Sequence, residues 1–351
     1  DQALIRRLDL PRADLVTLAA SVRDGAAGLD FDIAAAAQLG AVLLPPETRA
    51  ALRGVRTLRV LAGGPLASLP FGLLVLEEGA KGKGPGWLGD RFALANVAAL
   101  GSAPPARAAR GSGLVAFAAP TPFAATEAGG AAGTAVFSPA TYFERGGADA
   151  TRLAELPPLP GSEREARAIA REFETAGTRL FLGDAASEAS LADPGVGRAE
   201  VLLFATHGLV GGELEGIAEP ALILSPSPVG PGEGGQGDGV LTASEIARLD
   251  LAADWVILTA CDSAAGFEGG VPAFSGLVSA FRFAGGGSVL ATHWQVRDDV
   301  AAYVATQMLR HYRRHGDKAE ALHHAIRSLR RESGLPGADR PEIWAPFVLI
   351  D

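Results

Sequence analysis

The sequence predicts an α/β fold built on a mostly parallel sheet with helices on both faces. Short apolar runs rich in β-branched residues follow one another at 178–183, 200–208, 254–262 and 287–294. Helical segments lie between or after most of them, and continuous apolar strands alternating with helices are typical of a parallel sheet that is covered on both faces. In such sheets, ligand sites form just beyond the carboxyl ends of the strands.

The first part of the chain has a different pattern. Residues 1–55 space their apolar positions as helices do, so we expect a helical lead-in. Two short strands, expected to be buried, follow at 57–64 and 113–120, with a glycine-rich turn between them. We therefore divide the chain into this lead-in, a small α/β part over 56–110 and a main α/β domain over 111–351.

Two helix starts carry a capping-box pattern, in which a hydroxyl residue is followed three positions later by a glutamate. One is Ser162 with Glu165, and the other is Thr242 with Glu245. Each pair predicts that the hydroxyl residue is the N-cap and that the glutamate bonds back to it.

Composition excludes several classes of protein. The net charge is 31 − 40 = −9, which argues against nonspecific nucleic-acid binding. The single cysteine excludes an intrachain disulfide and a zinc site of several thiolates, and it favours a reducing compartment. No membrane span or secretory leader is predicted. We expect a cytoplasmic protein with no metal and no cofactor, and, because residue 1 is Asp, we expect further residues upstream.

Negative charge is concentrated in one stretch. Residues 208–272 contain ten acidic residues and a single basic one, Arg248. A surface with this balance favours a cationic partner. We expect this stretch to surround the functional site.

Two residues at strand ends are candidates for chemistry. His207 ends the run 200–208, and Cys261 ends the run 254–262 within "VILTACDSAAG". A lone cysteine is most often an unreactive core residue, but a histidine on a neighbouring strand end could convert this thiol to a thiolate nucleophile. His293 ends another strand with the same letters, "ATH", and is the rival base.

The assembled motifs resemble those of the CHAT family, a group of caspase-like domains that usually follow helical TPR arrays in bacteria. The matching segments run in order along the chain and include "GGPLASLPFGLL", "LPPLPGSEREARAIA", "LLFATHG", "DGVLTASEIARLDL", "VILTACDSAAG", "GLVSAFRFAGGGSVLATHWQVRDD" and "IWAPFVLID". The resemblance extends from about residue 40 to the end. It implies a caspase-like fold related to separases and gingipains.

The resemblance implies a cysteine peptidase dyad. His207 matches the general base and Cys261 the nucleophile, while the backbone N–H groups of Gly208 and Cys261 match the oxyanion hole. No metal or cofactor is assigned to this site, and a calcium requirement is left open. The expected partners are a protein substrate and an upstream helical, TPR-type region that regulates activity.

The resemblance also implies a pocket for the residue before the cleaved bond. In related separases a W-x-V-x-D segment supplies an acid to this pocket. Here "WQVRD" places Trp294 and Asp298 at those positions, with Asp299 next to them, and Asp262 follows the cysteine. We expect specificity for Arg or Lys. His293 departs from the family, which commonly has an aliphatic residue there.

The expected function is therefore cleavage of a partner protein after a basic residue. The alternative is a catalytically silent CHAT domain that acts as a scaffold or interaction module. Cleavage of peptides by the wild type and by Cys261→Ala separates the two.

Overall fold

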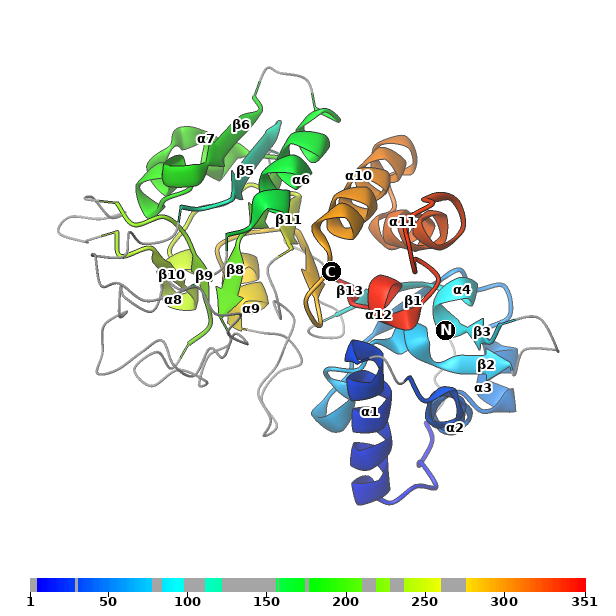
Figure 1. Ribbon diagram of the computed structural model, residues 1–351. Helices are drawn as coiled ribbons and strands as arrows, with labels where there is room; N and C mark the ends of the chain where they lie inside the picture. Colours follow the sequence, from blue (N-terminus) through cyan, green and yellow to red (C-terminus); the bar gives the residue numbers. More distant parts are fainter. Residues whose placement is uncertain are drawn as a thin grey trace, which may run out of the picture.

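The computed structural model describes residues 5–28, 31–77, 84–97, 111–121, 156, 158–173, 177–209, 219–227, 237–259 and 276–351. Its centre is an eight-stranded sheet that runs through the whole molecule (Figure 1). In spatial order the strands are β1 (Thr57–Val60), β4 (Ala93–Asn96), β13 (Phe347–Ile350), β12 (Ser288–Thr292), β11 (Trp255–Leu258), β7 (Val201–Ala205), β5 (Leu114–Ala118) and β6 (Arg179–Leu182).

Neighbouring strands of this sheet are parallel except at one place. The exception is the β12–β13 pair, which is antiparallel. The mostly parallel sheet predicted from the sequence is thereby confirmed. The strands β1 and β4 of the 56–110 part join this sheet beside β13, so that part builds no separate main sheet. β1 lies at the sheet edge and is only partly buried, because it has a neighbour on one side alone.

The continuous apolar strands serve two cores, one on each face of the sheet. On β7, Val201 and Leu203 point into one core, and Phe204 points into the other. The first core includes side chains of α6 (Pro160–Ala170), α10 (Asp298–His315) and α11 (Lys318–Glu332). The second includes side chains of α7 (Pro194–Arg198), α8 (Ala243–Ile246) and α9 (Gly276–Phe283). Alternate residues of each strand face opposite sides, so every position of β5, β7 and β11 is apolar.

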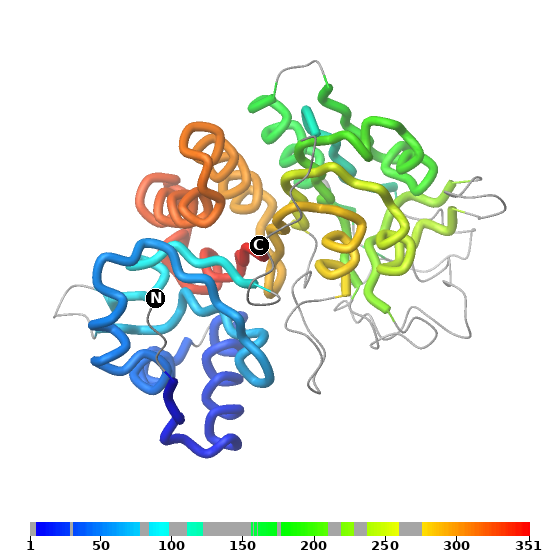
Figure 2. The backbone as a smooth tube through the Cα atoms, turned by 180° about the vertical axis from the view of Figure 1, so that it is seen from behind, coloured from blue at the N-terminus to red at the C-terminus, as the bar shows by residue number. Residues whose placement is uncertain are grey.

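The N-terminal segment is helical, with α1 (Arg12–Ala27), α2 (Ile33–Leu43) and α3 (Pro46–Ala51). Val22 of α1 and Leu39 of α2 belong to the same core as α10 and α11. Gly40 allows α2 to lie directly against the backbone of Val75, where a Cβ would overlap the carbonyl oxygen. Figures 1 and 2 show this region at one end of the molecule, with β5 and β6 at the other.

Shorter elements complete the described residues. They are β2 (Val75–Glu77), β3 (Gly86–Trp87), α4 (Leu88–Arg91), α12 (Pro341–Trp344) and single 3-10 turns at Gly64–Leu66, Phe71–Leu73, Gly183–Ala185 and Glu188–Ala192. β2 and β3 pair with each other in a two-stranded antiparallel sheet.

The run predicted as one strand over 200–208 is two strands in the structure. β7 ends at Ala205, and the chain turns at Thr206 into β8 (His207–Leu209). β8 pairs with β9 (Ala221–Ile223) in a small antiparallel sheet that also contains β10 (Val240–Thr242). His207 therefore begins a new strand just past the carboxyl end of β7.

One of the two predicted capping boxes is confirmed and the other is wrong. Thr242 and Glu245 form the full reciprocal box at the start of α8. Ser162 is not an N-cap, because α6 begins at Pro160, whose ring lacks an N–H and suits the first helical position. The Ser162 hydroxyl instead accepts from the Ala119 N–H at 2.8 Å. Glu165 therefore does not form the capping hydrogen bond that the sequence predicts for it.

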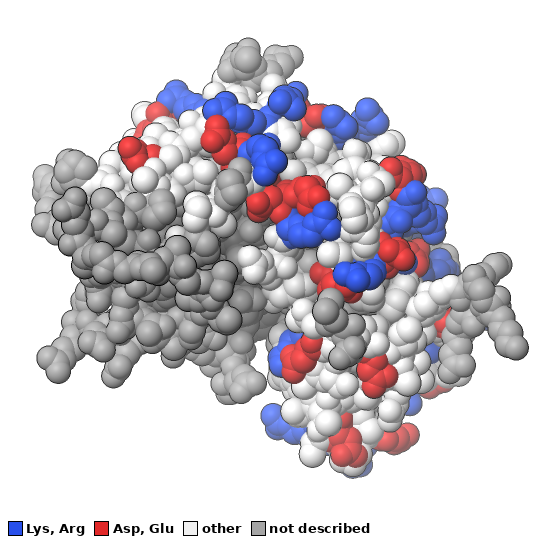
Figure 3. Space-filling view, viewed as in Figure 1, with Lys and Arg blue, Asp and Glu red and all other residues white. Residues whose placement is uncertain are grey.

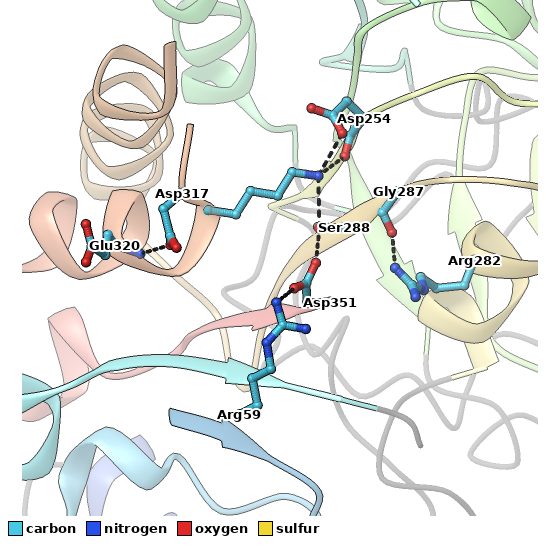
Figure 4. A network of polar contacts seen from close by, with 9 residues as sticks. Arg59, Asp254, Arg282, Gly287, Ser288, Asp317, Glu320 and Asp351 are labelled. Carbon is cyan, nitrogen blue, oxygen red and sulfur yellow. Dashed lines mark hydrogen bonds and ion pairs between the residues drawn. The ribbon is translucent and has the colours of Figure 1, made fainter. Parts of the chain in front are cut away.

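A polar network centred on the buried Ser288 connects elements at the amino ends of β11 and β12 (Figure 4). The Lys318 ammonium donates to the Asp254 carboxylate at 2.9 Å and to the Ser288 hydroxyl at 3.0 Å. Ser288 donates to Asp351 at 2.7 Å, and Arg59 of β1 pairs with Asp351 at 3.1 Å. This network lies at the opposite end of the central strands from His207.

Candidate active site

A cleft of about 810 Å³ opens beyond the carboxyl end of β7. Its walls come from the first turns of α6, from the start of β8 and from the segment that leads into α10. The ionisable residues that line it are Arg164, Glu165, His207, Arg297, Asp298 and Asp299. The cleft thus brings together three residues predicted as site residues from distant parts of the sequence, which are His207, Asp298 and Asp299.

The fold positions His207 by the break between β7 and β8. The residue is half-buried, and its backbone lies opposite Ile223 in the β8–β9 pair. Gly208, which follows it, is also half-buried and lies opposite Leu222. The side chain of His207 therefore lines the cleft from a strand whose backbone is held by a neighbouring strand.

Cys261 and Asp262 lie outside the described residues. The preceding strand is described as far as Thr259, two residues before the cysteine. The Thr259 N–H donates to the Phe204 carbonyl oxygen at 3.2 Å, so β11 stays paired with β7 to that point.

Asp298 and Asp299 stand at the first positions of α10 but have different partners. Asp298 accepts a hydrogen bond from the Gly161 N–H, and a Cβ on Gly161 would overlap its carboxylate. Burial raises the pKa of Asp298, while the nearby Arg164 guanidinium opposes that shift. Asp299 accepts two hydrogen bonds from Arg297, at 3.0 Å and 2.5 Å. The Asp299 charge is thus compensated by Arg297.

Glu165 is a cleft residue that sequence reasoning missed. Only 2% of it is exposed. Burial is the main cause that raises its pKa to about 8; a hydrogen bond from the Thr259 side chain opposes this increase, and the Asp298 charge adds a smaller contribution to it. Its Oε1 atom has no hydrogen-bond partner among the described residues. At neutral pH this carboxyl is protonated.

A signal for Glu165 was present in the sequence. The apolar stripe of the predicted helix contains Ala166, Ile169 and Phe173, and Glu165 falls on the same face, four residues before Ile169. A glutamate on the buried face of a helix is uncommon unless a partner or a function holds it there. The capping-box pattern concealed this signal.

Trp294, expected in the specificity pocket, is not among the described residues that line the cleft. Its indole is 9% exposed and donates to the Glu342 carbonyl oxygen at 3.0 Å. It borders a separate cavity of about 160 Å³ with Ala27 and Ile343. This hydrogen bond ties the segment that leads into α10 to α12, on the side away from the cleft.

His293, the rival base, is also absent from the cleft. Its ring borders a small cavity of about 60 Å³ beside Phe71 and Trp344. Burial lowers its pKa to about 4, and the Arg23 charge contributes to the decrease. A neutral imidazole in an apolar cavity on another part of the molecule leaves His207 as the histidine of the cleft.

The acid-rich stretch 208–272 does not supply the described part of the cleft wall. Of its ten acids, the five that are described do not line the cleft; they are Glu219, Asp238, Glu245, Asp250 and Asp254. Most have local structural roles, such as the Asp254 contact with Lys318 and the Glu245 capping bond. Figure 3 shows acidic and basic side chains interspersed over the described surface on the face of the molecule that is drawn there. The other five acids of the stretch lie outside the described residues, so the expectation stays a prediction for them.

The described residues contain no group of three or more His, Cys, Asp or Glu suited to a metal ion. None of the described helices is long and apolar enough to cross a membrane.

The class of protein follows from this architecture. A mostly parallel sheet with helices on both faces carries a histidine, in a cleft also lined by carboxyl and guanidinium groups, at the carboxyl end of a central strand, which is the arrangement expected of a caspase-like domain. The family model of the CHAT domain matches residues 34–351. The chain belongs to the CHAT domain family, a caspase-like family, as its motifs predict. A search of curated proteins found no match.

Proposed function

We propose that this CHAT domain is a cysteine endopeptidase in which Cys261 is the nucleophile and His207 the general base. The observation that supports the proposal most strongly is the register of the two strands that lead to these residues. β7 and β11 pair Val201 with Trp255 through Phe204 with Leu258, a constant offset of 255 − 201 = 54 positions. Cys261 follows His207 by the same number, 261 − 207 = 54.

The chemistry requires a thiolate, a proton carrier and donors for the oxyanion. His207 takes the thiol proton as the Cys261 sulfur attacks the peptide carbonyl, and it then delivers that proton to the leaving amine. The N–H groups of Gly208 and Cys261 stabilise the oxyanion of the tetrahedral intermediate. Water then hydrolyses the thioester, with His207 as the base, and regenerates the enzyme.

The proposed specificity is for Arg or Lys before the cleaved bond. Asp298 supports this assignment, because it lines the same cleft as His207 and opposite charges across an interface favour recognition. Asp299 is already paired with Arg297, so Asp298 is the stronger candidate of the two. Asp262 is retained as a wall of this pocket, and Trp294 contributes only by holding the segment that precedes Asp298.

The test is hydrolysis of fluorogenic peptides that end in Arg, Lys or Asp. Wild-type protein is expected to release the fluorophore from the Arg or Lys peptide and not from the Asp peptide. Cys261→Ala is expected to abolish turnover, and His207→Ala to lower kcat by about 10²- to 10⁴-fold. Absence of turnover with every peptide, also in the presence of the upstream region, would support the scaffold function instead.

The proposal includes a setting for the enzyme. It works in the bacterial cytoplasm, under control of an upstream helical, TPR-type region, on a partner protein. The family and the single cysteine support this setting. Co-purification of the chain with its upstream region, followed by measurement of peptide turnover with and without that region, tests the control.

A further inference from the structure

Among the described residues, three carboxyl groups line the cleft, and they differ in how many hydrogen bonds their oxygen atoms already accept. Asp299 is held by two hydrogen bonds from Arg297. Asp298 accepts from the Gly161 N–H and lies near the Arg164 guanidinium. Glu165 has a bond from the Thr259 side chain, but its Oε1 atom has no partner among the described residues. Of these three described carboxyls, Glu165 therefore has a buried oxygen atom without a hydrogen-bond donor.

The burial of Glu165 makes this free acceptor unusual. A buried oxygen without a donor costs about 1–3 kcal/mol relative to one that is bonded, so native proteins rarely leave one unless a ligand or water supplies the donor. The nearby Asp298 adds electrostatic repulsion to any ionised form of Glu165. A cation between the two carboxyls would remove both penalties.

We propose that Glu165 is a second specificity-determining carboxyl, which receives the cationic side chain of the substrate together with Asp298. This inference rests on the proposed function, since it concerns the recognition site of the same cleft. The Thr259 hydrogen bond places the Glu165 carboxyl beside the end of β11, two residues before Cys261 in the sequence. The cation would thus be held next to the strand that leads to the nucleophile.

Binding at this site exchanges one proton. In the empty cleft Glu165 carries its proton, because burial raises its pKa to about 8. A bound guanidinium or ammonium favours the carboxylate, so the Glu165 proton leaves to solvent as the cation enters. The other charged groups on the cleft wall are Arg164 on the same helix, His207 on β8, and Arg297, Asp298 and Asp299 at the start of α10.

The first experiment compares peptides that differ only in charge. Citrulline has the shape of arginine without its positive charge, so the ratio of kcat/KM for an Arg peptide to that for the citrulline peptide measures charge recognition. Glu165→Gln is expected to lower this ratio by about 10- to 100-fold, which is the loss expected for a buried hydrogen bond between charged groups. Glu163→Gln is the matched control, because Glu163 lies on the same helix, is paired with Arg167 and does not line the cleft.

The second experiment does not require turnover. Agmatine, which carries the arginine guanidinium, is titrated into Cys261→Ala protein by calorimetry at about pH 7 in two buffers of different ionisation enthalpy. The difference between the two heats gives the number of protons released. We expect release of close to one proton from Glu165, and the loss of this proton and at least tenfold weaker binding when Glu165→Gln is added to Cys261→Ala.

Two further variants identify which residue releases the proton when agmatine binds. Asp298→Asn is expected to weaken agmatine binding but to retain most of the proton release, because burial, the main cause of the raised Glu165 pKa, is unchanged. His207→Gln identifies any proton contributed by the imidazole. Folding of each variant is checked by circular dichroism, and Glu165→Gln is expected to fold, because it replaces a neutral carboxyl by a neutral amide of the same shape.

The outcomes separate this inference from the proposed function. Turnover of the Arg peptide with an unchanged Arg-to-citrulline ratio and unchanged proton release in Glu165→Gln would overturn the role of Glu165 and leave the peptidase intact. Absence of turnover in wild type, with agmatine binding and proton release that depend on Glu165, would overturn the peptidase and support the cation site.

Discussion

The buried carboxyl of Glu165 makes the stability of this domain depend on pH in a direction opposite to that of most carboxylates. In the unfolded chain this group ionises near its ordinary value of 4.5, whereas in the folded protein burial raises its pKa to about 8. Between these values the folded state binds more protons than the unfolded state, so the free energy of unfolding falls as pH rises. Glu165→Gln removes this dependence.

The magnitude follows from the width of that window. Each pH unit within it lowers the free energy of unfolding by about 1.4 kcal/mol. From about pH 5 to about pH 8 the wild type therefore loses roughly 4 kcal/mol that the Gln variant retains, because the amide does not titrate. The variant should be little changed near pH 5 and distinctly more stable near pH 8.

Urea unfolding at several pH values measures this difference. Glu188, whose pKa burial raises to about 7, contributes a slope of the same sign to both proteins, so its effect cancels in the comparison. Glu163→Gln serves as the exposed control and should run parallel to wild type. If the wild-type and Glu165→Gln curves stay parallel from about pH 5 to 8, Glu165 is ionised in the folded protein, and the reasoning on its burial is refuted.

Three further predictions concern the cleft, the polar network and self-processing. Gly161→Ala should raise KM for an Arg peptide at least several-fold, because its Cβ would displace the Asp298 carboxylate, whereas Gly63→Ala, with open space around it, should not; equal KM values in all three proteins would contradict this. Lys318→Met should lower the free energy of unfolding by about 1–3 kcal/mol, since it leaves the half-buried Asp254 carboxylate without its ammonium partner; no measurable loss in urea unfolding would show that solvent and the remaining Tyr312 donor compensate the charge. With basic specificity, any self-cleavage between residues 208 and 260 must follow Arg248, and mass spectrometry that finds a cut after an acidic residue there would exclude that specificity.

The alternation of apolar strands and helices is a local property, and it was sufficient to predict the sheet. β7 and β11 are apolar at every position because both of their faces are covered, and such runs have few alternatives to a buried parallel strand. The antiparallel β12–β13 pair was not predictable in this way, since the direction of a strand depends on the connections around it.

The break after Ala205 shows the limit of reading a strand from hydrophobicity. The stretch 200–208 contains no glycine or proline before its last residue that would mark a strand end, yet Thr206 separates two strands that belong to different sheets. The second strand exists because β9 lies beside it, and β9 comes from a later part of the chain. Long-range pairing therefore decides the orientation of His207.

By itself, the sequence determined the fold class, the family and the strands that lead to His207 and Cys261, because motifs and hydrophobic periodicity are local in the chain. Only the tertiary structure decided what surrounds His207. In the folded chain, His293 and Trp294 border other cavities and not this cleft. Arg297 pairs with Asp299, and Glu165 lines the cleft wall. Burial and charge pairing depend on neighbours that are distant in sequence, so the same glutamate that resembles a helix cap in the sequence is a protonated, buried carboxyl in the folded protein.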